Sequence, residues 1–161
     1  MATHGLALAL ALVTTGCGVA ANAHALGATA PLAAGHTTCP DADLHAVTAQ
    51  VNALRHRAGV HLLGADAYLA EVARSRSAAM AAANRLSHSG WERALRKAGL
   101  TDDTLGENVA YNYATPDAVM QGWLASPGHR ANILRPSFKR IGVGCVIDAH
   151  GHRWWTQDFA G

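Results

Sequence analysis

The N-terminal segment of the chain sets the first limit on what can fold. Residues 6–25 contain no Lys, Arg, Asp or Glu, and residues 6–13 form an apolar run typical of a secretory signal. Small-x-small patterns follow at residues 21–23 and 23–25, as cleavage requires. We therefore predict a signal peptide over residues 1–25. An uncleaved membrane anchor is the alternative, because the first five residues lack Lys and Arg.

Export changes how the cysteines are interpreted. Of the 3 cysteines, Cys17 lies in the predicted signal peptide, which leaves Cys39 and Cys145 as an even pair. An oxidising compartment favours a disulfide between them, and the bridge would close nearly the whole domain. Two buried free thiols are the alternative for this pair. A lipoprotein that keeps Cys17 is the alternative to a cleaved soluble form, although Thr14 stands where such signals usually carry Leu.

Composition narrows the class of protein. The chain has 161 residues, 50% of them hydrophobic, which suits one packed domain and excludes disorder. A formal net charge of +2 without a block of like charge gives no support for nucleic-acid binding. We expect a flexible lead-in over residues 26–38, one domain over residues 39–161, and a monomer with no membrane span once the signal is removed.

The hydrophobic spacing predicts helices first and strands last. Leu44, Val47, Val51 and Leu54 recur at spacings of three and four, which indicates a helix with one buried stripe from Asp41 to near Gly59, with Asp41 as its N-cap. A second helix is predicted over residues 66–85, with Arg74, Arg76 and Arg85 pointing outward. Shorter helices are predicted at 91–98, at 116–124 and after Ser126, and a hairpin is predicted from strands at 141–147 and 153–159. This order indicates an α+β fold, a small antiparallel sheet covered by helices.

Four local clusters together identify a family resemblance. They are Leu86-Ser87-His88-Ser89, Gly106-Glu107-Asn108, residues 126–134 (SPGHRANIL) and residues 155–159 (WTQDF). In this order they resemble the CAP superfamily of cysteine-rich secretory, antigen 5 and pathogenesis-related proteins (the SCP domain), in its short secreted bacterial form. The resemblance implies an α-β-α sandwich with a central cleft and an extracellular or cell-envelope location.

The resemblance also implies the residues of the cleft. His88 matches the first histidine, Glu107 the acid of the Gly-Glu-Asn motif, and His129 the second histidine. Many relatives carry a Glu three residues after the Trp of the preceding helix, but here Ser126 stands at that distance from Trp123. The fourth acid is therefore unassigned.

Structural support is predicted for three further side chains. Asn108 and Gln157 resemble positions that brace the cleft, where an amide can join backbone segments through its donors and its acceptor. Ser126 is explained best as a helix cap rather than as a nucleophile for His129. Asp117 lies upstream on the preceding helix and is not assigned.

Two chemistries are open for the cleft. His88, Glu107 and His129 form a candidate ligand set for a divalent cation such as Zn²⁺, Mg²⁺ or Ca²⁺, and a bound water could then hydrolyse a peptide-like bond. Without a metal, the same side chains can make ordinary hydrogen bonds. A metal clip is also conceivable at His150 and His152, which flank a turn glycine, although surface histidines are the simpler interpretation.

We therefore predict an exported binding module rather than an enzyme. Its His/Glu/His cleft would take a divalent cation, a lipid or another envelope ligand. The alternatives are a metal-assisted, peptidase-like hydrolase that uses the same cleft, and a surface protein with a purely structural role.

Overall fold

The computed structural model describes Met1 and residues 31–161. The body of the predicted signal peptide and Cys17 fall outside the described residues. Within residues 31–161 the chain alternates short strands with helices before it closes with a hairpin. In chain order the elements are β1 (Thr37–Thr38), α1 (Asp41–Arg57), β2 (Gly64–Ala65), α2 (Ala67–Ala82), α3 (Trp91–Lys97), β3 (Leu105–Tyr111), α4 (Pro116–Ala125), α5 (Pro127–Leu134), β4 (Arg140–Ile147) and β5 (Arg153–Ala160).

The sheet is built around the predicted C-terminal hairpin. Strands β4 and β5 pair antiparallel, and β3 pairs antiparallel with the other edge of β5, so that the order is β1-β4-β5-β3. Strand β2 adds a short parallel pairing to β4. Two features of the sheet correct the prediction. Strand β3 was not expected, and Thr37 and Thr38, which belong to the expected flexible lead-in, pair with β4.

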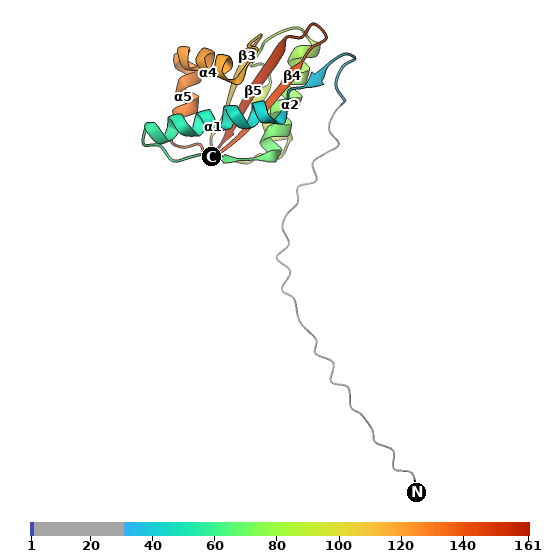
Figure 1. Ribbon diagram of the computed structural model, residues 1–161. Helices are drawn as coiled ribbons and strands as arrows, with labels where there is room; N and C mark the ends of the chain where they lie inside the picture. The colour runs from blue at the N-terminus through green and yellow to red at the C-terminus, as the bar shows by residue number, and fades with distance from the viewer. Residues whose placement is uncertain (2–30) are drawn as a thin grey trace.

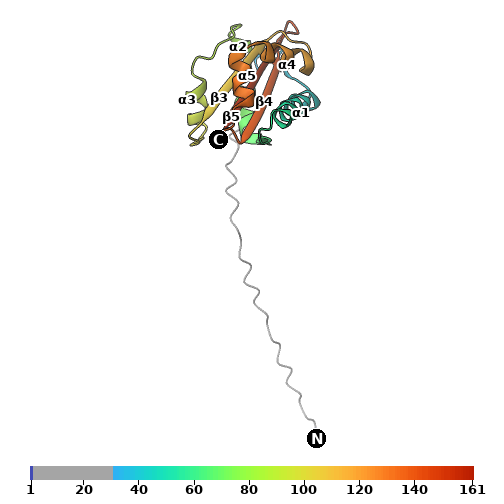
Figure 2. The same cartoon turned by 90° about the vertical axis from the view of Figure 1, so that its left-hand side faces the viewer.

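Helices cover both faces of this sheet, which confirms the predicted α+β sandwich. Helices α1, α4 and α5 lie on one face, and α2 lies on the other (Figure 1). In the view turned by 90°, α3 lies beside β3 at one edge and α1 lies near β4 at the other (Figure 2). Among the described residues, no helix combines the length and the apolarity that crossing a bilayer requires.

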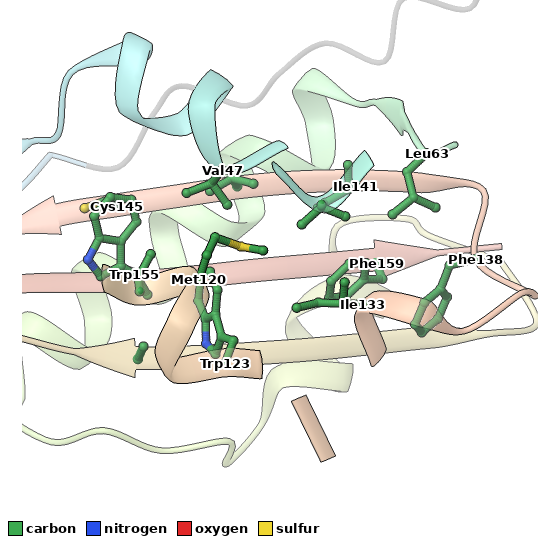
Figure 3. Close-up of a cluster of buried hydrophobic side chains, with 14 of the residues drawn as sticks. Val47, Leu63, Met120, Trp123, Ile133, Phe138, Ile141, Cys145, Trp155 and Phe159 are labelled. Carbon is green, nitrogen blue, oxygen red and sulfur yellow. The ribbon is translucent and has the colours of Figure 1, made fainter. Parts of the chain in front are cut away.

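The main core lies between the sheet and the layer of α1, α4 and α5. Trp123 and Trp155 are the largest of its side chains, and both are fully buried (Figure 3). The indole of Trp155 donates to Tyr113 O, which ties the sheet to the segment before α4. Val47 and Val51 from the predicted stripe of α1 are buried against them.

Two glycines allow the opposite layer to pack directly on the backbone of the sheet. A Cβ atom at Gly142 would overlap the backbone of Leu69, and one at Gly144 would overlap the backbone of Arg74. Helix α2 therefore lies unusually close to β4. This close packing positions the side chains of α2 against the polar residues of β3 and β5.

The caps of the helices differ from the prediction in two places. Pro40 occupies the N-cap position of α1, so Asp41 is the first helical residue and not the cap. Ser126 does stand at the N-cap of α5, but its hydroxyl makes no capping hydrogen bond. At α2 the cap is complete, because the side chain of Asp66 accepts from the backbone N–H groups of Tyr68 and Leu69.

Two long-range links fasten α1 to the rest of the domain. The predicted disulfide joins Cys39 to Cys145, and both residues are buried. At the other end of the helix the Arg55 side chain is also buried, and it donates to the carbonyls of His61, Ile133 and Arg135. Burial lowers the pKa of Arg55 below its ordinary value.

Candidate functional site

The centre of the site is a buried carboxylate on an edge strand. Glu107 lies on β3, and its side chain is fully buried. Arg76 of α2 reaches it with Nε 2.8 Å from Oε2 and Nη2 3.3 Å from Oε1. A guanidinium that contacts both carboxylate oxygens makes a strong, oriented pair. The charge of Glu107 is therefore balanced within the protein.

His88 lies in the loop after α2 and completes the contacts of Glu107. Its Nδ1 is 3.0 Å from Glu107 Oε1, while 51% of its side chain remains exposed. Arg76 also holds this loop, because its guanidinium donates to the carbonyls of Ser87 and Ser89. One arginine thus positions both the acid and the histidine of the site.

His129 approaches the same point from the beginning of α5. Its ring centroid is 6.1 Å from that of His88, and the two rings are tilted by 48°. Burial, together with the nearby charge of His88, lowers the pKa of His129 below its ordinary value. The structure therefore brings the three predicted cleft residues together, with Glu107 against His88 and His129 one ring farther away.

A network of amides lies on the other face of the same strands. Asn108 Nδ2 donates to the carbonyl of His129 at 3.2 Å and to Gln157 Oε1 at 3.0 Å. Asn132 of α5 donates to Asn108 Oδ1 and to the carbonyl of Glu107. These contacts join β3, β5 and α5 next to Glu107 and His129. Asn132 is a member of this network to which the sequence assigned no role.

A second acid, also missed, is buried behind Glu107. Asp158 pairs with Glu107 in the register of β5 and β3, and it is fully buried. Neither of its carboxyl oxygens has a hydrogen-bond partner within residues 31–161. Burial raises the pKa of Asp158 well above its ordinary value, and the charge of Glu107 raises it further while Arg76 opposes the shift.

The contacts of Glu107 with Arg76 and Asp158 join residues that are far apart along the chain, so local spacing in the sequence does not predict them. The helical spacing of α2 predicts that Arg76 points outward, whereas it turns onto β3 and pairs with Glu107. The strand register, which places Asp158 opposite Glu107, would have been the signal for the second acid. Asp117, by contrast, accepts from Gln50 of α1 and does not join the site.

A metal ion finds no ready ligand set in this arrangement. Within residues 31–161, no three His, Cys, Asp or Glu side chains converge closely enough to hold one. Both oxygens of Glu107 are already engaged, by Arg76 and by His88. The three cleft residues as they lie do not fit a metal centre, and a divalent cation in the cleft stays a prediction.

An open pocket of about 530 Å³ adjoins the exposed edge of His88. Helix α3 supplies its other walls, which are Gly90, Trp91, Glu92, Arg93 and Arg96. Arg96 pairs with Glu92 across 3.8 Å, so the lining leaves one arginine, Arg93, without a counterion beside a half-buried indole. Arg93 makes no ion pair or hydrogen bond within the described part of the chain, so its charge is available to a ligand.

Comparison with known sequences places most of the domain in one family. The sequence profile of the cysteine-rich secretory protein family (CAP) matches residues 48–159. The chain is 36% identical over 115 residues to the protein YkwD of Bacillus subtilis (strain 168), a match that covers 68% of this chain and 44% of YkwD. It is 35% identical over 118 residues to the B. subtilis membrane protein YlbC, covering 67% of this chain and 31% of YlbC. The chain thus spans less than half the length of these relatives.

Solved structures show the same architecture. An extracellular protein from Bacillus anthracis that contains an SCP domain superposes with a TM-score of 0.67 at 30% identity, covering 74% of this chain and 40% of that one. An outer surface protein of Borrelia burgdorferi superposes with a TM-score of 0.72 at 16% identity, covering 77% of this chain and 96% of its own. The second likeness, at this identity, concerns the fold alone.

Proposed function

The chain belongs to the CAP family of cysteine-rich secretory proteins, and from that premise we propose that it is an exported binding module for anionic lipid headgroups. The observation that carries the proposal is the pocket in which the exposed edge of His88 meets Trp91, Arg93 and Arg96. Export itself is supported by the signal-peptide pattern, by the disulfide and by the extracellular relative from B. anthracis.

The charge balance of the site favours an anion over a cation. Arg76 neutralises Glu107 inside the protein, so the acid does not draw a cation to the cleft. What the pocket offers to solvent is the imidazole of His88 and the guanidinium group of Arg93, because Arg96 pairs with the carboxylate of Glu92. Guanidinium groups bind phosphate oxygens through two parallel hydrogen bonds, which suits a phosphate-bearing ligand.

Apolar side chains around the pocket favour a lipid as the source of that phosphate. Leu86 is 45% exposed in the loop just before His88. Trp91 is half-buried in the wall of the pocket, and an indole suits the boundary between headgroups and acyl chains. Lys97 adds an exposed cation on the same helix, and each basic residue near an anionic surface contributes about 1 kcal/mol.

The experiment measures how the purified protein partitions onto phosphatidylglycerol vesicles and onto phosphatidylcholine vesicles. Arg93→Glu reverses one pocket charge, a change of about 2 kcal/mol that corresponds to roughly thirtyfold weaker binding to phosphatidylglycerol. Arg57→Glu is the matched control, because Arg57 is equally exposed but ends α1 on the other side of the molecule (Figure 2). Equal binding by both variants, or equal binding to both lipids, would contradict the proposal.

The hydrolase alternative receives less support from the same geometry. A general base needs a carboxylate oxygen that is free to take a proton, and both oxygens of Glu107 are engaged. Glu107→Gln would separate the two ideas, because a hydrolase would lose turnover whereas lipid binding through the pocket would persist.

A further inference from the structure

A second group of histidines lies at the tip of the β4–β5 hairpin. The turn spans Asp148 to His152, and it is closed by hydrogen bonds from Asp148 N to His152 O and from Gly151 N to Asp148 O. Gly151 adopts a φ of +83°, which L side chains rarely reach, so a glycine suits the third loop position. His150 and His152 flank it, and neither belongs to the cleft described above.

Asp148 fixes the shape of this turn from below. Its Oδ1 accepts the backbone N–H groups of His150 and His152, each at 2.9 Å. Its Oδ2 accepts from the indole of Trp154 at 2.9 Å. Three N–H donors therefore hold this carboxylate in place directly below the two histidines.

The same carboxylate orients His152. Nδ1 of His152 lies 3.4 Å from Asp148 Oδ2, and the ring rests against Tyr111 at a centroid distance of 5.5 Å. Tyr111 in turn packs on Trp154 at 4.2 Å. Because Nδ1 faces the acid, Nε2 points away from it and has no hydrogen-bond partner within residues 31–161. A carboxylate behind a histidine is the usual support of a metal-binding imidazole.

The distance between the two rings suits one shared ion. The ring centroids of His150 and His152 are 6.1 Å apart. With metal–nitrogen bonds of about 2.0–2.1 Å, each centroid lies about 3.2 Å from the ion, which allows centroid separations of about 4.5–6.4 Å. The observed separation corresponds to an angle of about 145° between the two ligands, wider than the roughly 109° of a tetrahedral site. Because His150 is exposed, a change of its rotamer can bring the two rings to the tetrahedral angle.

We propose that His150 and His152 form a surface site for a divalent transition-metal ion, with Asp148 as the supporting carboxylate. Neutral imidazoles favour Zn²⁺, Cu²⁺ and Ni²⁺ over Mg²⁺ and Ca²⁺. Two protein nitrogens bind the ion, and water completes its coordination.

The site is independent of the cleft. His152 lies just before β5, and Asp158 follows it by six residues along that strand, a separation of about 20 Å in an extended chain. Metal binding at the hairpin can therefore be measured without the cleft residues, and failure at one site leaves the other untouched.

The test is calorimetric titration of the purified protein with Zn²⁺ at pH 7.5, followed by EPR spectra with Cu²⁺. We expect one Zn²⁺ per chain, an affinity at least tenfold lower in His150→Ala and in His152→Ala, and Cu²⁺ spectra with coupling to two imidazole nitrogens. Asp148→Asn should weaken binding by about 10- to 100-fold, the usual effect of losing a carboxylate behind a ligating histidine.

Two controls locate the ion. His45→Ala removes an exposed histidine of α1 and should leave the affinity unchanged, as should the double variant His88→Ala/His129→Ala. The proposal is overturned if the wild-type protein binds no Zn²⁺, if the affinity survives in His150→Ala/His152→Ala, or if it is lost with the cleft histidines instead. Circular dichroism of each variant shows that the domain remains folded.

Discussion

Asp158→Asn replaces a buried carboxyl, which has no hydrogen-bond partner in the described part of the chain, with an uncharged side chain of the same shape. Asp158 faces Glu107 across the strands, and Arg76 is the guanidinium that acts on both acids. If Asp158 keeps its proton in the folded protein, the variant exchanges one neutral group for another. We therefore expect the site to keep its structure.

The difference in the free energy of unfolding between the wild-type protein and Asp158→Asn follows from proton linkage. The pKa of Asp158 is raised in the folded protein, so the folded state holds a proton that the unfolded chain has already released. The free energy of unfolding of the wild-type protein thus falls, relative to that of the variant, as the pH rises above the ordinary Asp value. The slope is about 1.4 kcal/mol per pH unit until the raised pKa is reached.

Urea unfolding followed by tryptophan fluorescence at several pH values gives the comparison. The wild-type protein and the variant should have similar free energies of unfolding near pH 4, and the variant should become the more stable one as the pH increases. Parallel curves over the whole range would refute the reasoning, since they would mean that Asp158 titrates alike in the folded and unfolded states.

A double-mutant cycle tests the shared arginine. Glu107→Gln leaves Arg76 without its first counterion. Removing one partner of a buried ion pair lowers the free energy of unfolding by about 3 kcal/mol. When Asp158 is present, its carboxyl can ionise and replace part of the missing charge. We therefore expect Glu107→Gln to lower the free energy of unfolding by only about 1–2 kcal/mol in this background, about half of the full value. The full loss should appear when Asp158→Asn is also present. Equal losses in both backgrounds would exclude Asp158 as a substitute counterion.

Three further changes test the scaffold through urea unfolding. Replacing Cys39 and Cys145 with Ala opens a loop with a sequence separation of 106 residues and should cost about 4–5 kcal/mol; a loss below about 1 kcal/mol would contradict this account. Arg55→Met removes a donor from four backbone carbonyls and should lower the free energy of unfolding by about 3 kcal/mol, with an unchanged midpoint as the refuting result. Gly144→Ala inserts a methyl group against α2 and should cost at least about 1–3 kcal/mol, whereas full stability would mean that α2 can move away.

Several features of the fold could be read from the sequence because they depend on local spacing. The stripe of Val47 and Val51 predicts the buried face of α1, since helical periodicity alone decides which residues share a face. The hairpin of β4 and β5 follows from two apolar runs around a turn. The disulfide between Cys39 and Cys145 follows from the predicted export, which leaves an even pair of cysteines once Cys17 is set aside with the signal peptide.

The tertiary structure alone decided which groups act together in the site. His88, Glu107 and His129 could be named from motifs, but the distances among them depend on how three separate elements pack. Arg76 and Asp158 carried no local signal, because an ion pair and a strand register join residues that are far apart along the chain. The charge of the cleft depends on these residues, which only the fold brings next to Glu107. The sequence by itself therefore determined the helices, the C-terminal hairpin and the candidate residues, and tertiary packing decided that an arginine, rather than a free carboxylate, governs the charge of the cleft.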